Sequence, residues 1–431
     1  MTTGTAQDFK NEAESTLRDT LQSVLAFSHK LHENPEPGFE EHQAVRWLAE
    51  ELKKVPGTRL EVGLGQLPTA LKAEVGNGEL VLTICAEYDA LPGIGHACGH
   101  NIIAAAALGA FTALAPLADT LGVTLRLLGT PAEENGGGKV LMLEQGDFDG
   151  THAAMMVHPG DVDEVEMLPY ACAGYRVSFH GRSAHASAHP WDGINALDAL
   201  TVALTAIGLA RQQLEPGQQI HGCVDSAGTA PNVIPELATG QWMVRAHDVD
   251  SLARATTVLN RCLEAGAIAA GARLEVAQEG PVYAELRTDA ATAELFGCNS
   301  AALGRPMHPA SRRGGSTDMA NVSHQFPTIH PMISLGEGCP PIHNQAFAEA
   351  AASPAGDNAI RDGALAMAWT CIDLATHTDT RRRLTRMALN EGAATFPTAM
   401  IGARIAVGSS DASLQNHGEP SSWTRPGDQP A

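Results

Sequence analysis

The sequence predicts an α/β fold, in which a mostly parallel sheet has helices on both faces and a smaller module is inserted into it. Two observations predict this fold. Apolar, strand-like runs alternate with helical stretches up to about residue 160. Beyond Tyr170 the pattern changes to a second, self-contained series of strands and helices. A length of 431 residues agrees with more than one domain, since domains average roughly 150 residues.

The first part of the chain opens with two helical stretches, an amphipathic one over 20–39 and another over 40–54. A strand, a helix, a strand, a helix and a strand follow at 80–90, 102–117, 123–134, 137–146 and 152–159. Strands that alternate with helices at this spacing are typical of a parallel sheet covered on both faces. Asp89, Glu133, Glu134 and His158 fall at the carboxyl ends of these strands, where open α/β sheets bind their ligands.

The inserted module is expected over residues 171–282. Its strands and helices follow the order β-α-β-β-α-β, at 173–181, 194–213, 219–228, 237–248, 251–271 and 272–280. That order is the ferredoxin-like signature. We therefore assign 1–170 and 283–405 to one domain and 171–282 to an inserted domain. Residues 406–431 lack periodicity and are rich in turn-forming residues, which predicts a disordered tail.

The charge of the chain restricts its partners. Lys and Arg number 28 against 49 Asp and Glu, a formal net charge of −21. Nucleic acids and anionic membranes repel such a surface, so we expect neither as a partner. A small-molecule substrate is the better expectation.

Cysteine usage and the chain start predict a cytoplasmic protein. The eight cysteines are dispersed without a C-x-x-C pair, which is typical of reduced, mostly buried thiols. The first fifteen residues are polar and contain no apolar core of a signal peptide. The longest apolar run, Ile102 to Ala115, is expected to be too short to span a bilayer and to form a buried helix.

Five dispersed residues form a candidate metal site. They supply one thiol, three imidazoles and one carboxylate, and they are Cys98, His100, Glu134, His158 and His343. This donor set suits a borderline divalent cation such as zinc or manganese. Glu133 directly precedes Glu134. Because successive side chains point in different directions, one carboxylate can hold a metal while its neighbour faces a water molecule.

Each donor has a simpler interpretation when taken alone. Cys98 is plausible as a core cysteine, and the Glu133–Glu134 pair as a solvated acidic helix start. His158 and His343 are compatible with ordinary positions at a strand end and in a loop. A thiol-nucleophile hydrolase with Cys98 and His100 stays open, although it leaves the other donors unexplained. A zinc finger and a P-loop are excluded because their spacings are absent.

The motifs together resemble the aminoacylase/acetylornithine deacetylase/succinyl-diaminopimelate desuccinylase family of metallopeptidases. The most similar branch contains p-aminobenzoyl-glutamate hydrolases, auxin-conjugate amidohydrolases and β-alanyl-lysine-type dipeptidases. The resemblance covers about residues 20–400 and rests on NPEPGFEE, AEYDALPGIGHACGHN, GTPAEENGGGK, HGRSAHASAHPWDGINALDA, TAPNVIPE, GSTDMANVS and IHNQAF. It implies a di-metal peptidase fold with an inserted lid and dimerisation domain.

The resemblance also implies a role for each site residue. Cys98 would bridge two metal ions (Mn or Zn, with Co as a further option), Glu134 and His343 would complete one ion, and His100 and His158 the other. Glu133 matches the general base. Asp89 matches the orienting Asp of the H-x-D motif, whose His is replaced here by Glu87, so that the first-strand ligand is missing. His185 matches a lid histidine that reaches the partner subunit's site of a homodimer, and Asn232, Arg245 and Ser316 match substrate-binding positions.

The expected function is hydrolysis of the amide bond of a small N-acyl or aminoacyl amino acid by a metal-activated water. Two alternatives stay open. One is hydrolysis of an aryl C–N bond or an aroyl-glutamate-type compound on the same site. The other is a non-catalytic, metal-dependent binding subunit, against which the intact Glu133 argues.

Overall fold

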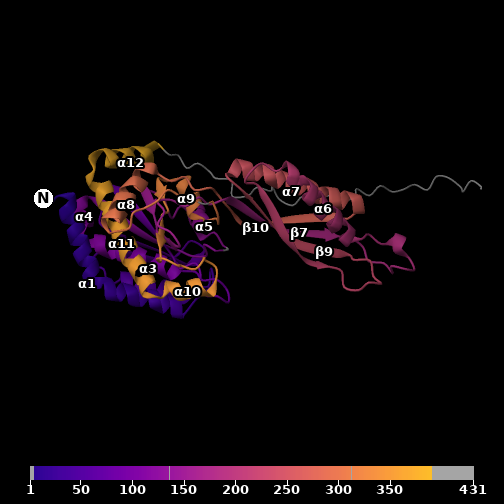
Figure 1. Cartoon of the computed structure of the whole chain (residues 1–431), viewed down its shortest axis with the longest axis horizontal. Helices are drawn as coiled ribbons and strands as arrows, with labels where there is room; N and C mark the ends of the chain where they lie inside the picture. Colours follow the sequence, from indigo (N-terminus) through magenta and orange to yellow (C-terminus); the bar gives the residue numbers. More distant parts are fainter. Residues whose placement is uncertain (1–3, 135, 312, 391–431) are drawn as a thin grey trace, which may run out of the picture.

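The computed structural model describes residues 4–134, 136–311 and 313–390. Figure 1 shows two bodies side by side: a helix-rich unit built from the two ends of the described chain, and a slimmer unit that contains α6, α7 and their sheet. We call them the first and the second unit. The tail predicted at 406–431, and residues 391–405 of the first domain, lie outside the described residues.

The first unit contains ten α-helices and eight strands within the described ranges. Its helices are α1 (Ala6–Glu33), α2 (His42–Leu52), α3 (His100–Leu114), α4 (Ala118–Leu121), α5 (Gly138–Gln145), α8 (Ala290–Ala302), α9 (Met319–Ser323), α10 (Gln345–Ala351), α11 (Pro354–Thr376) and α12 (Thr378–Asn390). Its strands are β1 (Arg59–Leu64), β2 (Leu67–Val75), β3 (Leu80–Glu87), β4 (Val123–Thr130), β5 (Ala153–Met155), β6 (His158–Gly160), β11 (Thr328–Ile329) and β12 (Met332–Ser334).

The main sheet has the strand order β1-β2-β4-β3-β5-β11. Strand β3 pairs in parallel with β4 and with β5, and β5 pairs in parallel with β11. The β1–β2 and β2–β4 pairs are antiparallel. A mostly parallel sheet is therefore confirmed. A separate parallel pair, β6 with β12, extends the layer beyond β5.

Alternating side chains give the main sheet two buried faces. On β3, Leu82 and Ile84 join the large core with α1, α3 and α11, while Cys85 joins a smaller core with α5 and α9. On β4, Leu127 and Leu128 divide in the same way. Because a strand places successive residues on opposite faces, a nearly continuous apolar run is what a doubly covered strand requires.

The structure differs from the sequence expectations at several places. The first helix, α1, ends at Glu33 and not at residue 39, and the strand expected at 152–159 is divided into β5 and β6. Strands β1 and β2 form an antiparallel hairpin that the sequence analysis did not predict. The apolar run beginning at Ile102 is also longer than expected, because a 3-10 turn continues it past Pro116. The resulting segment, His100–Leu121, is long and apolar enough to cross a membrane, but 89% of its most apolar window is buried inside the protein. It is the central helix layer of the first unit.

The second unit contains β7 (Ala171–His180), α6 (Ala196–Ala210), β8 (Gln219–Ala227), β9 (Leu237–Ala246), α7 (Val249–Ala270) and β10 (Arg273–Tyr283). Its four strands are all antiparallel and lie in the order β10-β7-β9-β8. Both helices bury one stripe on this sheet, for example Leu252, Leu259 and Leu263 of α7, in a core separate from that of the first unit. These elements follow the order expected for 171–282.

Candidate metal centre

The predicted metal donors converge at the carboxyl ends of the main strands. The Cys98 Sγ atom lies 3.5 Å from His158 Nε2 and 3.5 Å from His343 Nε2. His343 Nε2 lies 3.6 Å from Glu134 Oε2. Two sets of three donors each lie within 4.8 Å of one another, Cys98 with Glu134 and His343, and Cys98 with His100 and His158. Cys98 is common to both sets.

These separations fit a metal site. Zn–N and Zn–S bonds of about 2.0 and 2.3 Å at a tetrahedral angle place the two ligand atoms about 3.3 to 3.6 Å apart. His100 Nε2 and Glu134 Oε1 are buried and have no hydrogen-bond partner among the described residues. Buried polar atoms without a partner are rare and call for an ion or a water molecule. The donors therefore fit a divalent cation.

Asp89 fixes the orientation of His100. Its Oδ1 atom lies 2.9 Å from His100 Nδ1, which leaves the other ring nitrogen, Nε2, free to bind a metal. Its Oδ2 atom accepts a hydrogen bond of 3.0 Å from the backbone N–H of Glu134. A carboxylate behind a ligating imidazole sets its tautomer and raises its basicity. Asp89 thus orients a donor from α3 and the loop after β4 together.

Burial and neighbouring charges shift the pKa values of these groups. Burial alone would raise the pKa of Asp89, but the charge and hydrogen bond of His100 lower it to about 2. Burial, followed by the charge of Glu134, raises the pKa of the Cys98 thiol well above its usual range. Burial, followed by the charge of His330, lowers the pKa of His158 to about 3. A bound cation opposes the effect on Cys98, because coordination favours the thiolate.

Glu133 lies beside the donors without belonging to either set that contains Cys98. Its Oε2 atom lies 3.9 Å from His100 Nε2, and its backbone carbonyl accepts a hydrogen bond of 2.6 Å from the Tyr283 hydroxyl. Burial, followed by the charges of Glu87 and Asp318, raises the pKa of Glu133 well above its usual value. A raised pKa makes this carboxylate a stronger base, which suits it to accept a proton.

The backbone around the site is strained. Among the described residues, the non-glycine residues with positive φ are Phe39, Ala132 and His343, at 66°, 55° and 65°. Ala132 directly precedes Glu133, and its N–H donates a hydrogen bond of 2.8 Å to the buried Glu41 carboxylate. Left-handed backbone at such residues costs of order 1–3 kcal/mol each and clusters at functional sites. The strained backbone therefore lies at the donor His343 and directly before Glu133.

Sequence reasoning missed a buried charged triad beneath the donors. Lys139 Nζ lies 2.5 Å from Glu87 Oε1 and 2.7 Å from Asp318 Oδ1, and all three side chains are fully buried. Burial alone would raise the pKa of Glu87, but the charge of Lys139 contributes most to lowering it below its usual value. A lysine after three glycines was the available signal. His330 was missed too; its ring lies 5.6 Å from that of His158.

A cavity of about 520 Å³ opens beside the metal donors. Residues of both units line it, including Cys98, Glu133, Glu134, His158 and His343, and also Met167, Met243, Arg245, Glu279, Tyr283, Ser316 and Met332. The Arg245 guanidinium donates a hydrogen bond of 2.8 Å to Ser316 Oγ across the two units. The structure thus brings two of the three predicted substrate-binding residues to the donors.

His185 and Asn232 lie elsewhere. Strand β7 begins at the cavity, where Cys172 pairs with Arg245, and ends where His180 pairs with Leu237. A ten-residue strand spans roughly 30 Å. His185 and Asn232 follow in exposed loops at that far end, where the Ala186 N–H donates a hydrogen bond of 3.0 Å to the Asn232 carbonyl. The two are neighbours, but neither lines the cavity of its own chain.

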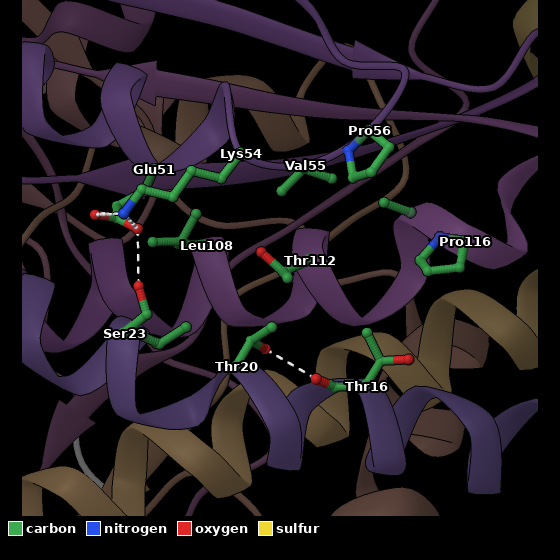
Figure 2. Close-up of a pocket in the computed structure, with 12 residues that line it drawn as sticks. Thr16, Thr20, Ser23, Glu51, Lys54, Val55, Pro56, Leu108, Thr112 and Pro116 are labelled. Atoms are coloured by element: carbon green, nitrogen blue, oxygen red, sulfur yellow. Dashed lines mark hydrogen bonds and ion pairs between the residues drawn. The ribbon is translucent and has the colours of Figure 1, made fainter.

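A second cavity, of about 300 Å³, lies between α1, α2 and α3 (Figure 2). Its hydroxyl groups are partly satisfied locally: Ser23 donates to Glu51 at 2.8 Å, and Thr20 donates to the Thr16 carbonyl at 2.9 Å. It contains none of the metal donors. We therefore take the first cavity as the candidate active site.

Comparisons with known proteins show the family to which the chain belongs. The model of peptidase family M20/M25/M40 matches residues 84–360, and the chain belongs to this family, whose members are hydrolases that act on amide bonds. Among characterised relatives, the Xaa-Arg dipeptidases of Mus musculus and Homo sapiens are 33% and 34% identical to this chain, and each match covers 85% of this chain and 88% of the relative.

Solved structures share the fold. A putative aminohydrolase from methicillin-resistant Staphylococcus aureus superposes with a TM-score of 0.72 at 21% identity, over 84% of this chain and 99% of that one. The YXEP protein of Bacillus subtilis, described as a dinuclear metal binding peptidase, superposes with a TM-score of 0.63 at 22% identity, over 81% and 98%.

Proposed function

We propose that this protein hydrolyses the amide bond of a dipeptide or an N-acyl amino acid at a site that holds two divalent cations. The observation that carries the proposal is the convergence of four donors around Cys98, with Glu133 beside them and outside the two sets that contain Cys98. Cys98, Glu134 and His343 would hold one cation, and Cys98, His100 and His158 the other. Zinc and manganese suit this donor set best, and cobalt is compatible with it.

The chain's own residues supply the remaining chemistry. A divalent cation bound here would lower the pKa of a water molecule and polarise the amide carbonyl. Glu133 accepts the proton of the attacking water and passes it to the leaving amine. Asp89 holds His100 in the ligating tautomer through the 2.9 Å contact. The raised pKa of Glu133 supports this role, since a carboxylate of higher pKa is a stronger base toward water.

The substrate is proposed to carry a free carboxylate. Arg245 projects into the cavity with Ser316 as its partner, and a guanidinium is well suited to bind a carboxylate. The Xaa-Arg dipeptidases favour an aminoacyl-arginine among the candidates. Glu279 supports this choice, because it places a carboxylate on the cavity wall, paired with Arg176 at 2.5 Å. A basic side chain of the substrate would compete for that acid.

A homodimer is proposed to complete the site. His185 and Asn232 lie a strand's length from the cavity of their own chain, so they reach an active site only in a partner subunit or after a large movement. The second unit also presents apolar side chains to solvent, with Leu209 of α6 72% and Trp191 74% exposed. Strand β8 is an edge strand. Exposed apolar residues and an open edge favour pairing with a second copy.

We further propose a cytoplasmic location, supported by eight cysteines that are all free thiols.

The decisive test is a hydrolysis screen of dipeptides and of N-acyl and N-aroyl amino acids. Protein stripped by a chelator would be assayed alone and after addition of Mn²⁺ or Zn²⁺, with Glu133→Gln as the matched control. Turnover that needs both the metal and Glu133 supports the proposal. Metal binding without turnover of any substrate would favour the binding-subunit alternative.

A further inference from the structure

The position at which the sequence lacks its expected first-strand ligand is occupied by a charged pair. Glu87 ends β3, two residues before Asp89, and its Oε1 atom accepts a hydrogen bond from Lys139 Nζ at 2.5 Å. Lys139 lies in the first turn of α5, just after the loop that carries Glu133. A second carboxylate, Asp318, accepts hydrogen bonds from both the side chain and the backbone N–H of Lys139, at 2.7 and 2.9 Å.

The free oxygen of Glu87 lies near one donor of the cluster and outside the sets that contain Cys98. Glu87 Oε2 is 3.5 Å from His100 Nε2 and has no hydrogen-bond partner among the described residues. It joins a set only with His100 and Glu133, and this set contains neither Cys98 nor His158. A cation shared with Cys98 therefore has no ligand from β3, whereas a cation displaced toward Glu133 would have one.

We propose that Lys139 is a fixed cation that balances the charge of Glu87 and keeps this carboxylate out of the ligand set. The second metal ion would then have Cys98, His100 and His158 as its only protein ligands. The inference rests on the proposed metal assignment. It gives Lys139 and Glu87 positioning roles: the lysine supplies a positive charge where the strand end would otherwise hold a carboxylate facing the metal.

Electrostatics supports this assignment. Burying an isolated charge is strongly unfavourable, and a cation at contact distance stabilises a buried carboxylate in its ionised form. Lys139 provides that contact without any metal, since Glu87, Lys139 and Asp318 are all fully buried. The same ammonium repels a divalent cation next to Glu87. The triad thus stabilises the metal-free protein and weakens the second metal position.

The first experiment measures metal content. Glu87→Gln leaves Lys139 paired with Asp318, and purified protein dialysed against Mn²⁺ or Zn²⁺ is expected to keep the wild-type number of ions by elemental analysis. Glu134→Gln is the matched control, a carboxylate in a donor set, and it is expected to lose metal. Loss of one ion from Glu87→Gln would overturn the inference, because Glu87 would then be a ligand.

The second experiment measures affinity. In Lys139→Met the freed Glu87 is expected to bind the weaker of the two ions at least about tenfold more tightly in calorimetric titration with Mn²⁺ or Zn²⁺, by Coulomb's law at an effective dielectric of about 20. The rise in Tm on adding metal should exceed that of the wild type. Lys10→Met is the control, since Lys10 is 15% exposed and pairs with Asp373 at 2.8 Å, away from the donors.

Each outcome decides the question. Tighter binding, or folding of Lys139→Met only when metal is present, supports the fixed-cation role. Unchanged or weaker binding overturns it. If Lys139→Met does not fold under any condition, the metal content of Glu87→Gln decides alone. Failure of the proposed metal assignment is distinguishable, because the wild-type protein would then bind no divalent cation at all. Failure of the hydrolysis screen alone leaves these binding measurements unaffected.

Discussion

Glu285 anchors the second unit to the first, and replacing it should destabilise the protein in a pH-dependent way. Its carboxylate accepts a hydrogen bond of 3.1 Å from the Val249 N–H at the start of α7 and lies 3.3 Å from His324 Nε2, just after α9. Its side chain is 15% exposed. Burial alone would raise the pKa of Glu285, but the hydrogen bond with His324 and further contacts lower it to about 2.

The expected magnitude follows from this shift. From an unfolded value of 4.5 to about 2, the lowered pKa corresponds to about 3 kcal/mol of unfolding free energy at pH 7, at 1.36 kcal/mol per unit. A carboxyl with a lowered folded pKa stabilises above its unfolded pKa, and the contribution is lost as the pH falls through the folded value. At pH 2.5 it should be below about 1 kcal/mol.

The assay is urea unfolding of the wild type and Glu285→Gln at several pH values from 7 to 2.5. Glutamine keeps the shape and an acceptor for the Val249 N–H, so the variant removes mainly the charge. The two midpoints should differ most at pH 7 and approach each other as the solution becomes acidic. A difference that stays constant over this pH range would refute the reasoning, because it would show that lost packing, and not the ionised carboxylate, destabilises the variant.

Three further predictions concern the active site. Glu133→Gln should keep the metal content and lower kcat by roughly 10²- to 10⁴-fold, as measured by elemental analysis and steady-state kinetics. Glu134→Gln, in contrast, should also lose metal. A Glu133→Gln protein with near wild-type kcat would contradict the assignment of Glu133 as the base. A chelator should abolish activity and divalent ions should restore it; full activity of the metal-free protein, with inactivation by alkylation of Cys98, would instead indicate a thiol nucleophile. Mixing inactive His185→Ala with inactive Glu133→Gln under subunit exchange should restore partial activity, because one site of the heterodimer then has both groups; no recovery despite proven exchange would exclude the cross-subunit role.

Local sequence signals were sufficient for most of the catalytic architecture. The donors lie next to the strand ends or glycine turns that orient them, so the same stretch of sequence predicted both the motif and the secondary-structure element. Glu133 and Glu134 follow β4 directly, and Cys98 and His100 flank the glycine that begins α3. Parallel strands end at one edge of a sheet, which is why residues from distant segments could be expected to meet. Their distances required the folded chain.

Other features depend on contacts that no local pattern encodes. The β1–β2 hairpin was missed because its outer strand is mostly exposed, with only Leu64 fully buried, so it lacks a strong apolar alternation. The charged triad unites Glu87, Lys139 and Asp318 from three elements. A buried lysine is identical in sequence to a solvated one, and only packing reveals its environment.

The placement of the second unit likewise belongs to the tertiary structure. The sequence predicted its strand and helix order from periodicity, which is a local property. It did not place Arg245 at the cavity and His185 at the opposite end of the same sheet. The separation of Arg245 from His185 follows from the direction in which β7 and β9 run. It also depends on the point at which β10 returns the chain to the first unit. The sequence by itself therefore determined which residues are the candidate metal donors and the candidate base, while long-range packing decided which of them a single chain brings together.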